Sequence, residues 1–351
     1  MKNRFGVMFA TLMALAVGWG GALAISRGVG ELARTANGGK NLLQTAAAIL
    51  PAFSPGKTDY AGGTAASNNS PDKTITVIIG GDIMMDRAIR RLGEIKGYDT
   101  LFAEVAPTFR AADIAVANLE GPITAEPSKT LNDRGATTDS FAFTFAPETA
   151  GALARAGLDA VSMANNHSDN FGASGIEQTR KYLSAAGVEW FGTPWNATSS
   201  EAVICKKGVC VALVGYHAFQ SGFERIVSRV QELKAKGDFV VVMPHWGVEY
   251  SPHPTDTMRK QARELAAAGA GAIVGAHSHV IGDNEWLGEV PVYYSLGNLL
   301  FDQYFSAKTM EGLLVELYIS PGNGKPTLDH VDTLRVKDDP GRGIILSDVV
   351  N

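Results

Sequence analysis

The sequence predicts an α/β fold, because apolar runs of strand length alternate with amphipathic stretches of helix length from residue 74 onward. The runs with the length and composition of buried strands are residues 74–80, 113–118, 159–164, 209–216, 239–244, 272–276 and 290–297. The stretches with helical periodicity are residues 147–157, 174–187, 223–237 and 255–269, and each ends at a glycine, as helices commonly do. We therefore expect sheets of largely buried strands, connected by helices.

Two further β-prone runs, residues 312–320 and 330–336, follow the last of these strands and are expected to close the same domain. The chain has 351 residues, of which 45% are hydrophobic, and this is enough to bury a sizeable core. We predict one α/β domain over residues 74–319, with a C-terminal extension at 320–351 that belongs to it.

The N-terminus predicts export. Lys2 and Arg4 precede residues 5–25, which carry no charge and are long enough to span a bilayer, for which about 20 apolar residues suffice. Positive charges in front of the segment keep the N-terminus in the cytoplasm and send the rest of the chain outward. Residues 1–25 are thus expected to be a signal anchor in the cytoplasmic membrane, with the domain on the periplasmic or extracellular side.

Cleavage of this segment is the alternative. Ala22 and Ala24 give the small-x-small form of a signal peptidase site, so a secreted protein cut near Ala24 is also compatible with the sequence. Residues 26–73 mix Gly, Ala, Ser, Thr, Asn and Pro without a sustained apolar period, and we expect a flexible linker there.

Charge and cysteine usage restrict the class of protein further. A net charge of -5 and a pI near 5.8, without a basic stripe, argue against a nucleic-acid binder.

Cys205 and Cys210 flank a Lys-Lys-Gly turn between two β-prone runs, so they can face each other across a hairpin. A disulfide there would persist in an oxidising compartment, and two free thiols at a sheet edge are the alternative.

Polar side chains that can bind metal follow six of the predicted strands. In open α/β sheets the carboxyl ends of the strands share one edge, where ligands bind, so these side chains are expected to converge. Four of the seven histidines are among them. The full set is Asp82, Glu120, Asn165, Asn166, His167, His245, His277, His279, Asn298 and Asp302.

Imidazoles mixed with carboxylate and amide oxygens, and no thiolate, suit one or two divalent ions of Mn, Fe or Zn. A pair of ions can clamp the attacking and leaving oxygens of a displacement reaction. Each residue alone also has an ordinary structural interpretation, since carboxylates cap helices and asparagines shape turns. The joint occurrence at six strand ends favours the metal site.

Six motifs in this order resemble the CapA family of poly-gamma-glutamate capsule biosynthesis proteins, within the calcineurin-like metallophosphoesterase superfamily. They are GDIMMDR, NLEGPI, ANNHSDNFG, HWGVEY, GAHSHV and YSLGNLLFDQ, within residues 74–305. The resemblance implies a four-layer α/β/β/α sandwich with an N-terminal membrane anchor. It also implies, as partners, a polyanionic polymer such as poly-gamma-glutamate or a phosphoester substrate, together with other capsule synthesis or export proteins.

The same resemblance implies a role for each site residue. Asp82 and His279 would bind the first ion, and Glu120 would stand where a bridging carboxylate usually lies. The second ion would be bound by Asn166, His245 and His277. His167 would be the catalytic residue that donates a proton to the leaving oxygen or stabilises the transition state.

The chain departs from the family pattern at several positions. Met84 occupies the histidine position of the superfamily's Asp-x-His motif, and Glu120 replaces its usual Asp. After the Asn-Asn-His segment the acid is Asp169 rather than residue 170, which is Asn170. Met84 is a poor ligand for a hard ion, so a single ion is an alternative to two. A non-catalytic polymer-binding protein is likewise an alternative to a hydrolase.

Substrate contacts are predicted from residues near the strand ends. Arg87 lies on one helical face with Arg90 and Arg91, close to Asp82, and arginines there can bind a phosphate or a polycarboxylate. A solvated helix face is the alternative. The remaining substrate contacts are expected from Asn165, Asn298 and Asp302. The functional hypotheses are a CapA-like component of capsule synthesis or export, a metal-dependent phosphoesterase or polymer hydrolase, and a binding protein.

Overall fold

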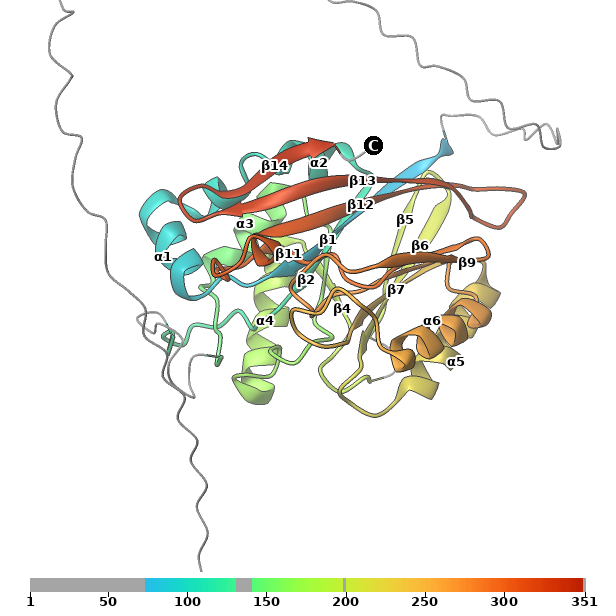
Figure 1. The fold of residues 1–351 in the computed structure, drawn as a ribbon, viewed down its shortest axis with the longest axis horizontal. Helices are drawn as coiled ribbons and strands as arrows, with labels where there is room; N and C mark the ends of the chain where they lie inside the picture. Colours follow the sequence, from blue (N-terminus) through green and yellow to red (C-terminus); the bar gives the residue numbers. More distant parts are fainter. Residues whose placement is uncertain (1–72, 131–140, 198–199, 350–351) are drawn as a thin grey trace, which may run out of the picture. The chain divides into compact units, whose positions relative to one another are not determined.

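The computed structural model describes residues 73–130, 141–197 and 200–349, which form two β-sheets with helices on both outer faces (Figure 1). The expected signal anchor at 1–25 lies outside the described residues, as does the expected linker except for its last residue, Lys73. Among the described helices, none has the length and apolar character needed to cross a membrane.

The first sheet has eight strands in the order β14-β13-β12-β1-β2-β3-β4, and β11 also pairs with β1. Strands β1 to β4 run parallel to one another, whereas β12, β13 and β14 are antiparallel additions at one side. The strands are β1 (Ile75–Ile83), β2 (Ile114–Leu119), β3 (Ala160–Ser162), β4 (Glu189–Phe191), β11 (Asn298–Leu300), β12 (Glu311–Ser320), β13 (Thr327–Asp339) and β14 (Gly343–Val349).

The second sheet has six strands in the order β5-β6-β7-β8-β10-β9. Its central strands β6, β7, β8 and β10 are parallel, and the two edge strands are antiparallel to their neighbours. The strands are β5 (Ala202–Lys206), β6 (Val209–His217), β7 (Phe239–His245), β8 (Ala272–Val274), β9 (Asn284–Leu287) and β10 (Val290–Tyr293). Cys205 and Cys210 pair across the β5–β6 hairpin and form a disulfide.

Helices cover the outer face of each sheet. Over the first sheet lie α1 (Arg87–Lys96), α2 (Ala106–Ala111), α3 (Glu148–Ala156) and α4 (Gly172–Ala186), and over the second lie α5 (Phe223–Lys236) and α6 (Asp256–Ala268). Two 3-10 turns, η2 (Tyr98–Phe102) and η3 (Lys308–Met310), complete the described helices. The four helices predicted to end at a glycine do so with a left-handed glycine at each C-terminus.

Alternate residues of a single strand belong to different layers of the core. Val77 and Ile79 of β1 pack between the two sheets, while Ile78 packs against the helices of the first sheet. In β7, Val241 likewise faces the other sheet and Val242 faces α5 and α6. Because both faces of these strands are buried, the strands read as continuous apolar runs. The predicted α/β fold with two sheets is confirmed, and its layers follow the order helices, sheet, sheet, helices.

The predicted strand at 290–297 ends early in the structure. Only its first part, Val290–Tyr293, forms a strand, β10 in the second sheet, and after Gly297 the chain continues as β11 in the first sheet. Gly297 has φ +71°, and a Cβ there would lie 2.7 Å from the backbone oxygen of Glu311, so only glycine fits this crossing. The crossing brings the start of β11 to the carboxyl end of β1, where Asn298 pairs with Asp82.

Candidate metal centre

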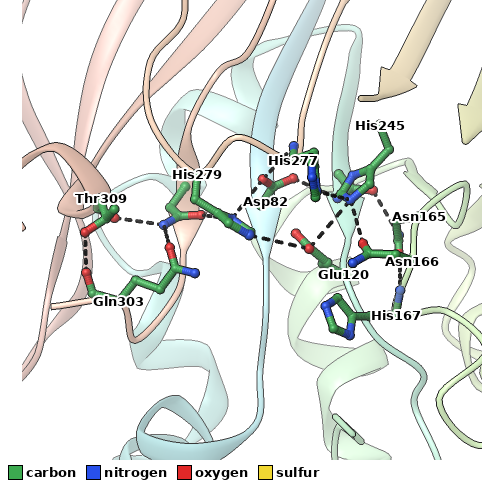
Figure 2. A network of polar contacts seen from close by, with 12 residues as sticks. Asp82, Glu120, Asn165, Asn166, His167, His245, His277, His279, Gln303 and Thr309 are labelled. Atoms are coloured by element: carbon green, nitrogen blue, oxygen red, sulfur yellow. Dashed lines mark hydrogen bonds and ion pairs between the residues drawn. The ribbon is translucent and has the colours of Figure 1, made fainter. Parts of the chain in front are cut away.

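The expected convergence of strand ends occurs in the structure. Asp82 lies at the end of β1, Glu120 directly after β2, His245 at the end of β7, and His277 and His279 after β8. All five side chains are buried, and Figure 2 shows them directed toward one another around Glu120. The two sheets therefore contribute to one site from their carboxyl ends.

These side chains form two groups that could each hold a cation, and both groups contain Glu120. One group consists of Asp82, Glu120 and His279, the other of Glu120, His245 and His277, and the ligand atoms within each lie within 4.8 Å of one another. His279 Nε2 and His245 Nε2 are each 3.7 Å from Oε1 of Glu120. A carboxylate common to both groups is what a bridge between two ions requires.

Asn166 extends the second group. Its Oδ1 lies 2.8 Å from Nε2 of His245, and the same nitrogen lies 3.1 Å from Nδ1 of His277. The amide oxygen and the two imidazole nitrogens thus face a common point, as shown in Figure 2. Asn166 was expected to be a ligand of the second ion, and the structure brings it to that group.

The surroundings of Glu120 test whether a cation fits. Both carboxylate oxygens are buried and have no hydrogen-bond partner among the described residues. Burial, reinforced by the nearby Asp82, raises the pKa of Glu120 well above its ordinary value. A buried carboxylate without donors is costly unless a cation compensates its charge, so the residues present fit a metal ion.

The histidines fit the same conclusion. Burial lowers the pKa of His277 to about 4 and that of His245 well below its usual range, so both offer a neutral imidazole with a lone pair. For His279 burial alone would lower the pKa, but Glu120 and Asp82 outweigh it and raise the pKa to about 9. The carboxyl groups of Glu120 and Asp82 thus favour a positive charge at the position of the His279 ring.

Side chains around the two groups fix the orientation of the ligands. Asn298 Oδ1 lies 2.9 Å from Nδ1 of His279, which leaves Nε2 directed to Glu120. Asn118 Nδ2 donates to Asp82 Oδ1 at 2.7 Å. Such outer hydrogen bonds set the tautomer and position of metal ligands. The sequence reasoning did not identify Asn118, although it is the first residue of the NLEGPI motif.

The backbone at the two histidines after β8 is strained. His277 has φ +97° and His279 has φ +56°, which are left-handed values that non-glycine residues rarely adopt. The backbone N–H of His277 donates to Asp82 Oδ2 at 3.1 Å and helps to hold this conformation. Strain of this kind is typical of functional sites, where the surrounding structure maintains it.

His167 lies beside the second group at the edge of a pocket. Its Nδ1 lies 3.2 Å from Oδ1 of Asn170, an oxygen that also accepts from the backbone N–H of Phe143 at 2.8 Å. The His167 ring packs on Phe143 at a centroid distance of 4.5 Å. Burial lowers the pKa of His167 to about 4. Asn170, at the position where the family pattern has an acid, therefore orients His167 without adding a charge.

Two residues expected to contact substrate have other roles in the structure. Asn165 is fully buried: its Oδ1 accepts from the backbone N–H of His167 and from Ser168, and its Nδ2 donates to Asn118 and to the backbone of Leu119. It therefore shapes the turn after β3.

Asn298 is also fully buried and holds His279, while its Nδ2 donates to Gln303 and to the backbone oxygen of Thr309. Neither side chain lines the pocket beside the site, and the expected substrate contacts of Asn165 and Asn298 stay predictions.

Met84 contributes no ligand. It is fully buried in the core under the helices of the first sheet, and its sulfur accepts from the backbone N–H of Asp86 at 3.1 Å. The Asp86 carboxylate in turn accepts from Ser128, Thr130 and the backbone of Thr144, so it organises the loops around the start of α1. The first group therefore has three side-chain ligands, from Asp82, Glu120 and His279.

A pocket of about 440 Å³ opens beside the site. Arg87 and Asp302, both predicted to contact substrate, line it and form an ion pair with each other. Arg90, on the same helix, instead pairs with Glu94 and donates to the backbone of Thr144. Of the arginines on α1, Arg87 and Arg91 line the pocket.

His217 is a further buried histidine that the sequence left unassigned. It lies opposite His245 in the register of β6 and β7, and the two ring centroids are 6.1 Å apart. Its Nδ1 lies 2.9 Å from the backbone oxygen of Pro194, and its Nε2 has no hydrogen-bond partner in the described part of the chain. Burial lowers the pKa of His217. The position of His217 in the GYHAF segment, at the end of a predicted strand, is the sequence feature that could have placed it near the site.

Two sheets between helical layers, with acidic and histidine side chains gathered at the carboxyl ends of their strands, define an α/β protein with a candidate metal centre. The chain belongs to the bacterial capsule synthesis protein PGA_cap family, whose model matches residues 76–303. The six motifs had predicted this family over residues 74–305, and the prediction is confirmed.

Two curated relatives carry the same association. The chain is 29% identical over 280 residues to the PGA biosynthesis protein CapA of Bacillus subtilis, covering 74% of this chain and 72% of that protein. It is 29% identical over 281 residues to the capsule biosynthesis protein CapA of Bacillus anthracis, covering 74% and 67%.

Similarity to solved structures is more distant. The calcineurin-like phosphoesterase YfkN from Bacillus subtilis is 16% identical, with 79% of this chain and 92% of that chain covered and a TM-score of 0.45. The protein TT1561 of Thermus thermophilus is 12% identical, with 69% and 93% covered and a TM-score of 0.39.

Proposed function

We propose that this protein is a metal-dependent hydrolase that cleaves phosphoester bonds during capsule or extracellular polymer biosynthesis. The observation that carries the proposal is Glu120, a buried carboxylate without hydrogen-bond partners among the described residues that belongs to two potential cation groups. A site with two adjacent cation positions suits in-line displacement at phosphorus better than simple structural metal binding. Mn, Fe and Zn are the divalent ions that this ligand set favours.

Each residue has a distinct part in the proposed reaction. Asp82, Glu120 and His279 would hold one ion, and Glu120, Asn166, His245 and His277 the other. Bound ions would supply Lewis acidity and make a nucleophile available near neutral pH. His167, oriented by Asn170, lines the pocket beside this site and would exchange a proton with the leaving oxygen.

The biological setting is inferred from the family and from the N-terminus. Both curated relatives are named for capsule or PGA biosynthesis, so we propose that this protein acts in the same process, with a polyanionic polymer such as poly-gamma-glutamate and other capsule proteins as partners. Lys2, Arg4 and the uncharged residues 5–25 support attachment to the cytoplasmic membrane with the domain facing outward.

The test is hydrolysis of bis(p-nitrophenyl) phosphate by the full chain, purified in detergent and stripped with a chelator. Activity is expected only after Mn²⁺, Fe²⁺ or Zn²⁺ is returned. His167→Gln is expected to lower kcat at least about 100-fold, the usual range for a lost general acid or base. Glu120→Gln is expected to remove the metal-dependent activity, because Glu120 belongs to both cation groups. His253→Gln is the matched control, because His253 is exposed and pairs with Asp283. Folded, metal-loaded protein that hydrolyses neither phosphodiesters nor phosphomonoesters would refute the proposal.

A second candidate function is non-catalytic binding of the polymer. The observation that favours it is Met84, whose sulfur is turned into the core and leaves the first group with three side-chain ligands. If this alternative holds, the metal-loaded protein binds poly-gamma-glutamate without turnover, and His167→Gln leaves that binding unchanged.

A further inference from the structure

We propose that the pocket beside His167 holds a flat aromatic leaving group of the substrate. This inference rests on the proposed function and specifies its substrate class: phosphoesters whose leaving oxygen is attached to an aromatic ring. The pocket has a volume of about 440 Å³, within the range of small-ligand sites.

The position of the pocket assigns it to the leaving group. His279 lines it and also belongs to one of the two cation groups, and His167, which directly follows Asn166 in the chain, lines it as well. The pocket therefore begins beside the position that the reacting phosphorus would take. His167 is the residue proposed to exchange a proton with the leaving oxygen. The group attached to that oxygen must therefore extend into the space on this side of His167.

The rim of the pocket consists of exposed aromatic side chains. Phe141, Tyr250 and Phe305 are 59%, 44% and 69% exposed, and all three line the same pocket. Tyr250 and Phe305 contact each other edge to face, with centroids 5.3 Å apart. Large apolar rings are seldom left exposed together unless they serve in binding.

Tyr250 is held firmly at this rim. Its φ is +64°, a left-handed value for a bulky residue, and its backbone N–H donates to the backbone oxygen of Ser278 at 2.7 Å. Gln303 Nε2 donates to the Tyr250 hydroxyl at 3.4 Å. The strained segment thus fixes the ring 6.2 Å from that of His279, next to the candidate metal centre.

The inner wall of the pocket consists of planar groups that pack on one another. The guanidinium of Arg87 lies 5.0 Å from the ring centroid of Phe143 and 5.7 Å from that of Phe301, and its charge is paired with Asp302. Phe143 and Phe301 are only 1% and 2% exposed, so these inner groups support the wall and leave little surface for stacking. The exposed rings at the rim are therefore the groups that would stack on a flat aromatic ligand.

The test compares phenylphosphonate with methylphosphonate, which share the phosphonate group and differ in the ring. Binding of each to the metal-loaded full chain is measured by calorimetry, and inhibition of bis(p-nitrophenyl) phosphate hydrolysis is measured in parallel. We expect phenylphosphonate to bind at least tenfold more tightly. Tyr250→Ala and Phe305→Ala should each reduce this preference about two- to tenfold, the value of one aromatic contact. Their affinity for methylphosphonate should not change.

Trp286→Ala is the matched control, because Trp286 is 54% exposed on β9 and is not part of the pocket. Equal affinity for the two phosphonates in a protein that hydrolyses phosphodiesters would overturn the inference and leave the proposed function intact. Loss of the ring preference in Trp286→Ala as well would also overturn it. A folded, metal-loaded protein that neither hydrolyses the ester nor binds either phosphonate would refute both proposals.

Discussion

Replacement of Glu120 by glutamine should change the stability of this protein in opposite directions with and without metal. Glu120 is fully buried, and neither of its carboxylate oxygens has a hydrogen-bond partner among the described residues. In a chelator the neutral amide removes a buried acidic group, and Glu120→Gln should be more stable than the wild type. With metal present the wild type should be the more stable protein, because the carboxylate belongs to both cation groups.

Glutamine keeps a buried carbonyl oxygen, so the gain in the chelator does not come from removing an unsatisfied acceptor. It comes from the raised pKa of Glu120, because the folded chain holds a proton there that the unfolded chain releases at neutral pH, and glutamine has no such proton to bind. An ion at 100 times its dissociation constant adds about 2.7 kcal/mol to the free energy of unfolding, so two ions add about 5 kcal/mol. For a domain of this size that corresponds to a rise of roughly 10–20 °C in Tm.

Thermal unfolding of the wild type and of Glu120→Gln, each with EDTA and with excess Mn²⁺, checks the direction of the stability change both without and with metal. His253→Gln, an exposed histidine variant, should respond to Mn²⁺ as the wild type does. An equal rise of Tm on adding Mn²⁺ to Glu120→Gln and to the wild type would contradict the assignment of Glu120 as the shared ligand.

Three further predictions concern residues around the site and the fold. Asn298→Ala removes the partner of His279 Nδ1 and should weaken metal binding about 10- to 100-fold in a Mn²⁺ titration; unchanged affinity would exclude this orienting role. Cys205→Ser opens a disulfide that joins residues 5 apart, and should lower the free energy of unfolding by about 2 kcal/mol in urea while metal binding is retained. Burial raises the pKa of Asp338 to about 8, so the folded state favours the protonated form of this carboxyl group. The free energy of unfolding should therefore fall as the pH rises from about 4 to about 8, by up to roughly 1.4 kcal/mol per pH unit. Asp338→Asn should remove this pH dependence of the free energy of unfolding. A pH profile of urea unfolding identical to that of the wild type would contradict the role of Asp338.

Much of the architecture could be predicted because it depends on local patterns. Strands such as β1 and β7 are buried on both faces and therefore read as apolar runs, and the helices end at glycines. The passage of the chain from β10 in the second sheet to β11 in the first could not be predicted, since it depends on the close approach of Gly297 to the backbone of Glu311, which the sequence pattern does not specify.

In the candidate site, too, some features could be predicted from the sequence and others could not. Residues that follow strands, such as Asp82 and His245, could be expected to converge because parallel strands end at a shared edge. The roles of Asn165 and Asn298 depend on which neighbour each amide reaches, and the sequence does not specify these contacts. Whether Asn170 faces His167 or solvent is likewise decided by the turn after β3.

The most direct test of the central claim is a count of the ions bound to the full chain. Wild-type protein equilibrated with Mn²⁺ and freed of excess metal should retain two ions per chain, Glu120→Gln should retain none, and His277→Gln should retain one, because Glu120 belongs to both groups and His277 to one. Wild-type protein that is folded but retains no Mn²⁺, Fe²⁺ or Zn²⁺ above the level of Glu120→Gln would contradict the claim that this site is a metal centre.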